Sequence, residues 1–195
     1  YTIDLVAVAA LNRAAALLAA FGLLLERRNH VSAAAILRMQ LDNALRFSSL
    51  LRVEDANAAA TAILRGTRVK DLIDREGKKL TDSRLVELFA DDKDWVPEVY
   101  ERTSGYIHFS DAHIASAIFP SGTSEGGFRF KIGAEDEDIP DGIYQETIAA
   151  FWAATDLFLE LVERWTREKE TVEGMRRTAQ RVGDAPRTAH PHGEA

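Results

Sequence analysis

Residues 144–165, YQETIAAFWAATDLFLELVERW, carry the most regular pattern in the sequence. The positions that recur at steps of four and three are Tyr144, Ile148, Phe151, Thr155, Phe158, Val162 and Trp165. Such a repeat is typical of a helix that packs along its length against a nearly parallel partner. Asp141, in the preceding Pro-Asp-Gly turn, can cap this helix. We therefore predict a long last helix within a helical bundle.

The N-terminal part of the chain predicts two further long helices. Residues 3–28 are rich in Ala and Leu, contain no Pro and follow a helical stride. Asn29 or Ser32 can cap a second helix over about residues 33–53. Because this second segment is apolar on two faces, we expect it to lie at the centre of the bundle.

Shorter elements are expected between these long helices. A third helix begins after Asn57 and ends near Gly77, and a fourth begins at Thr81 or Asp82. Pro97 fits the first turn of a fifth helix, because proline is tolerated where the backbone N–H needs no helical partner.

A change of periodicity marks the segment before the last helix. The sequence FRFKI at residues 128–132 alternates apolar and basic side chains, and the run PSGTSEGG at residues 120–127 is rich in turn formers. This combination predicts a β-hairpin that pairs residues 114–119 with residues 127–132.

The predicted fold class is therefore all-α, a helical bundle with a small β-hairpin, about residues 114–132, inserted before the last long helix. Residues 1–166 form the bundle domain. Residues 167–195 turn polar and predict a C-terminal extension that is frayed at its end.

Composition excludes several classes of protein. The chain has 195 residues and no cysteine, so disulfide scaffolds, iron–sulfur clusters and thiolate zinc sites are ruled out. A formal charge of −7 argues against a general nucleic-acid coat protein. A local basic site remains compatible with that charge, since residues 26–70 contain eight basic and four acidic side chains.

The apolar N-terminal segment could be mistaken for a membrane span. Asn12 and Arg13 divide residues 5–25 into apolar runs of 7 and 12 residues, whereas a span needs about 20. We therefore predict a buried or interface helix, no membrane span and a cytoplasmic protein.

Familiar cofactor and metal motifs are missing from the sequence. It contains no phosphate-binding glycine loop, no dinucleotide fingerprint and no zinc-protease helix motif. His108, Asp111 and His113 lack the spacing of known metal sites, and the acidic run at 135–138 lacks the calcium-loop pattern. We expect neither a cofactor nor a metal.

Polar residues recur in two places where helices are expected. Arg38 and Asp42 lie one turn apart on the otherwise apolar second helix, so we expect them to be buried and paired. Tyr100, Ser104 and His108 follow one another at steps of four later in the chain.

These residues resemble the motifs of the HEPN superfamily, and more closely those of its bacterial and abortive-infection-type helical-bundle proteins. The matching elements are Leu37-Arg38 in an early helix and the later Tyr-x-x-x-Ser-x-x-x-His segment, within which Arg102 precedes His108 by six residues. The resemblance implies a bundle of four or five helices, often dimeric, and metal-independent RNA cleavage by Arg102 and His108. Imidazole would transfer the proton and guanidinium would stabilise the phosphate charge. Arg38, Asp42, Tyr100 and Ser104 would be supporting polar residues.

A structural role for the same residues is the alternative. On an unbroken helix, the side chains of Arg102 and His108 lie about 120° apart around the helix axis, so they do not share a face. Ser104 and His108 are one turn apart and do share a face. Ser104 and His108 would then form a buried polar link to the Arg38–Asp42 stripe.

Two functions follow. The first is an RNA-cleaving or RNA-binding component of a bacterial toxin or defence system, with RNA as the expected partner. The alternative is a catalytically silent helical scaffold for dimerisation or partner docking. The repeat on the last helix and the Ala-rich first helix together predict a homodimer.

Overall fold

The computed structural model describes residues 1–121, 126–136 and 138–183. The chain divides into two compact units, Tyr1–Leu161 and Val162–Ala195, and the last helix crosses the boundary. This boundary lies upstream of the predicted domain limit at residue 166.

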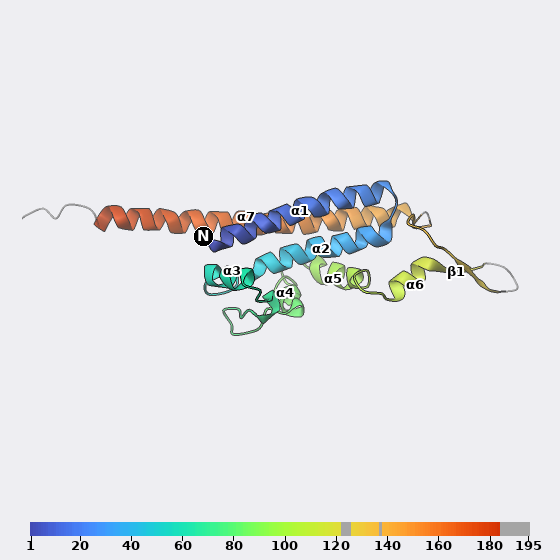
Figure 1. Ribbon diagram of the computed structural model, residues 1–195, viewed down its shortest axis with the longest axis horizontal. Helices are drawn as coiled ribbons and strands as arrows, with labels where there is room; N and C mark the ends of the chain where they lie inside the picture. The colour runs from blue at the N-terminus through green and yellow to red at the C-terminus, as the bar shows by residue number, and fades with distance from the viewer. Residues whose placement is uncertain (122–125, 137, 184–195) are drawn as a thin grey trace, which may run out of the picture. The chain divides into compact units, whose positions relative to one another are not determined.

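The first unit is helical, as the sequence predicts. Its long helices are α1 (Thr2–Glu26), α2 (His30–Ser49) and the first part of α7, which begins at Asp141. Figure 1 shows these three helices running lengthwise beside one another. The shorter elements are α3 (Ala56–Leu64), the single turn η1 (Val69–Asp71), α4 (Asp82–Glu87), α5 (Trp95–Ser104) and α6 (Asp111–Ala117).

Aromatic side chains hold the long helices together. The rings of Phe21 on α1 and Phe151 on α7 stack with centroids 3.9 Å apart. Phe47 on α2 meets Phe158 on α7 edge to face, with centroids 5.7 Å apart. Helix α2 also packs against α4 and α5, so it occupies the centre of the bundle as predicted.

Local chemistry explains where several helices begin and end. The Asn29 side chain accepts a hydrogen bond from Ser32 N at 3.0 Å, so α2 starts at His30, before the predicted residue 33. Thr81 caps α4, as predicted. Helix α3 ends at Leu64, and the prediction that it continues toward Gly77 is wrong. Gly66 has φ +98°, a left-handed conformation that ends a helix.

The β-hairpin is confirmed, but its strands are shorter than predicted. Strands β1 (Ile118–Pro120) and β2 (Phe128–Phe130) pair antiparallel, with Ile118 opposite Phe130. Residues 114–117 belong to α6, so their prediction as a strand is wrong. The stretch DAHIASA contains three alanines, which favour a helix over a strand.

The second unit contains the rest of α7, which runs to Gly183. Part of the predicted polar extension is therefore helical. The fraying predicted for the end of the chain lies outside the described residues.

Candidate functional site

The polar stripe of α2 forms an ion-pair network. Asp42 accepts hydrogen bonds from Arg38 Nη1 at 3.3 Å and from Arg46 Nε at 2.7 Å. Arg46 Nη2 in turn binds Asp82 of α4 at 3.0 Å. Arg38 is 8% exposed and the Asp42 side chain 20%, so the expected pair forms with Arg38 buried and Asp42 half-buried.

Tyr100 completes this network from α5. The Arg38 guanidinium carbon lies 3.8 Å from the centroid of the Tyr100 ring. Arg38 Nε is buried without a hydrogen-bond partner among the described residues. The aromatic face therefore supplies an attraction for the cation where hydrogen bonding is incomplete.

Ser104 and His108 do not form the buried link to this network. The Ser104 hydroxyl donates to the Tyr100 carbonyl at 2.6 Å, within its own helix. Helix α5 ends at Ser104, and His108 lies exposed in the bend that follows. The predicted buried link through Ser104 and His108 is wrong, because that prediction assumed a helix that continues through His108.

Arg102 lies near the end of α5, away from any contact with His108. Its guanidinium binds Glu98 at 3.3 Å and Glu146 of α7 at 3.0 Å. The hydrogen bond to Glu146 is the largest of the effects that raise the pKa of Arg102. Among the described residues, no hydrogen bond, ion pair or ring contact joins Arg102 to His108.

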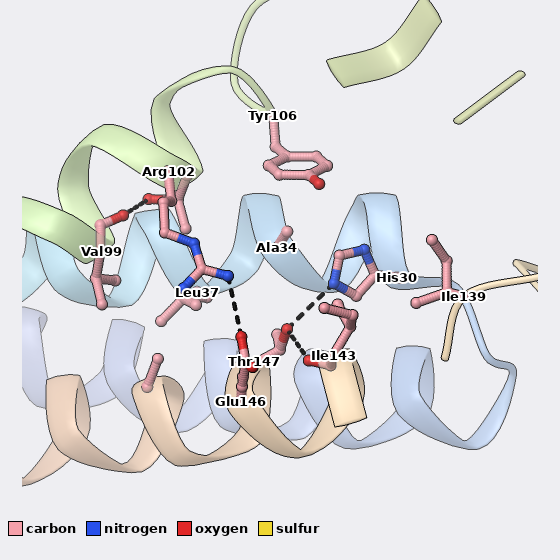
Figure 2. A pocket seen from close by; sticks show the side chains of 12 residues that line it. His30, Ala34, Leu37, Val99, Arg102, Tyr106, Ile139, Ile143, Glu146 and Thr147 are labelled. Atoms are coloured by element: carbon pink, nitrogen blue, oxygen red, sulfur yellow. Dashed lines mark hydrogen bonds and ion pairs between the residues drawn. The ribbon is translucent and has the colours of Figure 1, made fainter. Parts of the chain in front are cut away.

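A pocket of about 380 Å³ opens beside Arg102, between α2, α5 and the first turns of α7. Figure 2 shows Arg102 reaching across it to Glu146, with His30 and Tyr106 on the side toward the hairpin segment. Its apolar lining consists of Ala34, Leu37, Val99, Ile139, Ile143 and Ala150. Of the lining residues, the sequence motifs included Arg102 and Leu37, and nothing in the sequence alone joins the segments 30–37, 99–106 and 139–150 that form the pocket.

His30 is the buried titratable group of this pocket. It is 5% exposed, and burial lowers the pKa of its imidazole more than the nearby Asp136 raises it. Its Nε2 lies 3.1 Å from the Thr147 hydroxyl oxygen, while that hydroxyl donates to the Ile143 carbonyl at 2.8 Å. Since the hydroxyl proton is already used, His30 Nε2–H is the donor and Nδ1 is left as an acceptor.

The basic excess of residues 26–70 is partly compensated in the folded chain. Four of its eight cations pair with carboxylates: Arg28 with Asp141, Arg38 and Arg46 with Asp42, and Arg68 with Asp71. This segment is therefore less attractive to phosphate than its composition indicates.

The outer surface of α1 exposes a row of apolar side chains. Its exposed residues recur at steps of three and four, forming what we call the outer seam: Leu5, Val8, Asn12, Ala15, Ala19, Gly22 and Glu26. Leu5 and Val8 are 62% and 65% exposed, and the neighbouring Leu23 is 64% exposed. The buried residues of α1, such as Leu17 and Phe21, occupy the other side of the helix.

This helix is also long and apolar enough to cross a membrane by length and composition. Within the bundle, Arg13 donates to the side chain of Asn43 at 3.4 Å, and Asn43 donates to the Ala10 carbonyl at 3.1 Å. These bonds tie the middle of α1 to α2.

Comparisons with protein-family models, curated proteins and solved structures return no match. No group of three or more His, Asp or Glu side chains that could hold a metal ion occurs in the described residues.

Proposed function

We propose that this protein is a helical scaffold that forms a homodimer through the outer seam of α1. The observation that carries the proposal is the exposed, nearly all-apolar seam itself, in which Asn12 is the single polar residue between Leu5 and Gly22. Exposed apolar patches of this kind mark interaction surfaces, because leaving them in water is unfavourable.

The spacing of the seam favours another helix as its partner. Steps of three and four are the repeat of a helix that packs into a coiled coil, and a single polar Asn in such a seam favours a defined register. Ala15, Ala19 and Gly22 are small, so a second helix backbone can approach closely. A second copy of this chain presents the same seam, which is the condition for a two-fold symmetric interface.

The molar mass in solution tests this proposal. We expect light scattering to give a dimer for the full chain at high micromolar concentration and a monomer for Val8→Lys. Ile73→Lys is the matched control, because Ile73 is 47% exposed but lies in a loop away from the seam. It should stay dimeric.

A monomeric wild type, or a Val8→Lys protein that remains dimeric, would refute the proposal. Cosedimentation of the wild type, but not Val8→Lys, with phosphatidylcholine vesicles would also contradict it, because a lipid surface would then cover the seam.

The geometry supports RNA cleavage by Arg102 and His108 less well than it supports the homodimer. Arg102 carries two carboxylate partners and His108 is exposed in a bend outside the pocket. A role in a bacterial toxin or defence system stays a prediction from the resemblance alone.

A further inference from the structure

The pocket beside Arg102 has the composition of a small-molecule site and plays no part in the proposed dimer. Its volume of about 380 Å³ lies in the range of ligand pockets, which combine an apolar lining with a few polar groups. All of its lining residues belong to the first unit of the chain.

Two polar groups in the pocket have hydrogen-bonding capacity to spare. His30 Nδ1 is an acceptor without a partner among the described residues, because Nε2–H is committed to Thr147. The Tyr106 hydroxyl likewise has no hydrogen bond within the described chain. Burial raises the pKa of Tyr106, so its hydroxyl stays protonated at neutral pH.

The rings of these two residues form an aromatic corner. Their centroids lie 5.8 Å apart, with the ring planes at 82°. An imidazole nitrogen accepts a hydrogen bond in the plane of its ring, and a flat ligand ring beside Tyr106 would gain the edge-to-face or offset-stacked contacts that aromatic rings favour.

Charge at the mouth of the pocket selects against anions. Arg102 is the one cation among the described residues that line the pocket, and it is bound by the carboxylates of both Glu98 and Glu146. The cluster therefore carries one excess negative charge, and a phosphate or carboxylate ligand would have to displace a carboxylate from the guanidinium.

We infer that this pocket binds a small, planar heteroaromatic molecule that carries no negative charge and whose N–H group donates to His30 Nδ1. The apolar lining covers the ring, and the Arg102–Glu146 ion pair lies at the rim. This inference is independent of the dimer, since no residue of the outer seam lines the pocket.

Nuclear magnetic resonance of the full chain with ¹³C-labelled histidine tests the inference, with indole as the probe. We expect indole to shift the His30 ring resonance saturably and to lower the pKa of His30, because the donated hydrogen bond stabilises the neutral ring. Indene has the same shape without the N–H group and should bind about tenfold more weakly. Indole-3-carboxylate should also bind more weakly than indole.

A pair of adjacent alanines supplies matched variants. Ala150 lines the pocket and Ala149 is exposed on the same helix. Ala150→Leu should fill the site and weaken indole binding at least about tenfold, whereas Ala149→Leu should leave it unchanged.

An unchanged His30 resonance in saturated indole would overturn the inference. Equal binding of indene, tighter binding of indole-3-carboxylate, or undiminished binding by Ala150→Leu would each overturn it as well.

Discussion

Arg38 on α2 stacks its guanidinium on the ring of Tyr100 on α5, at 3.8 Å from the ring centroid. The same guanidinium binds Asp42, which also accepts from Arg46. Tyr100 therefore joins α5 to a charged network on the central helix. The motif residues that the sequence singled out thus meet in a contact between helices, at a distance from the exposed His108.

Removing Asp42 tests the network. Asp42→Ala leaves the buried Arg38 without its carboxylate partner, so we expect a loss of about 1–3 kcal/mol in the free energy of unfolding, measured by urea denaturation. Asp71→Ala, which breaks the exposed pair with Arg68, should change stability little. If the two substitutions lowered the free energy of unfolding equally, the burial of Arg38 would make no contribution to the strength of its ion pair.

The aromatic contact can be tested separately. Tyr100→Phe keeps a ring face over Arg38 and should retain wild-type stability, whereas Tyr100→Leu removes the ring face. We expect the second change to lower the free energy of unfolding by about 0.5–2 kcal/mol. A Tyr100→Phe protein as unstable as Tyr100→Leu would assign the effect to the hydroxyl instead.

Gly22 distinguishes a solvent-exposed face from a helix interface. A Cβ at this position would meet open space in the single chain, and Ala is favoured over Gly within a helix by about 1 kcal/mol. Gly22→Ala should therefore raise the melting temperature of the dilute monomer. It should also weaken the dimer in sedimentation equilibrium, because the added methyl group separates the packed helices. An unchanged dimer affinity would contradict close packing at Gly22.

The pH dependence of stability should carry a contribution from His30. Burial lowers the pKa of His30 below 6.5, so the unfolded chain takes up a proton at a higher pH than the folded chain. The contribution of His30 to stability is thus present above about pH 6.5 and is lost as the pH falls below it. Thermal melts between about pH 7.5 and about pH 5.5 should show a shallower pH slope for His30→Gln than for wild type. His108→Ala is the control, and a His30→Gln slope equal to that of wild type would be inconsistent with this account.

RNA cleavage has a direct test. Since Arg102 is held by Glu98 and Glu146, we expect the wild type to leave a mixed RNA pool intact in the presence of chelator. His108→Ala should melt at the wild-type temperature, because His108 is exposed. Chelator-resistant cleavage that disappears in both Arg102→Ala and His108→Ala, with folding unchanged, would instead support the ribonuclease implied by the resemblance.

Features set by local sequence were predictable. The repeat over residues 144–165 predicted the long last helix, and the Thr81 cap predicted the start of α4, because periodicity and capping act over a few residues. The apolar faces of residues 33–53 also predicted the central position of α2. The Arg38–Asp42 pair followed from residues one helical turn apart.

Features that depend on distant partners were decided by the tertiary structure alone. Helix spacing from Ser104 to His108 predicted a shared face, but α5 ends at Ser104 and the spacing no longer applies. Arg102 is bound by Glu146, which lies 44 residues away, and His30 by Thr147, which lies 117 residues away. The sequence by itself determined the long helices and the Thr81 cap, whereas the ends of α3 and α5 and the pocket were decided only by the folded chain. The physical reason is that hydrogen bonds along a helix depend on neighbouring residues, while a cavity depends on how whole helices meet.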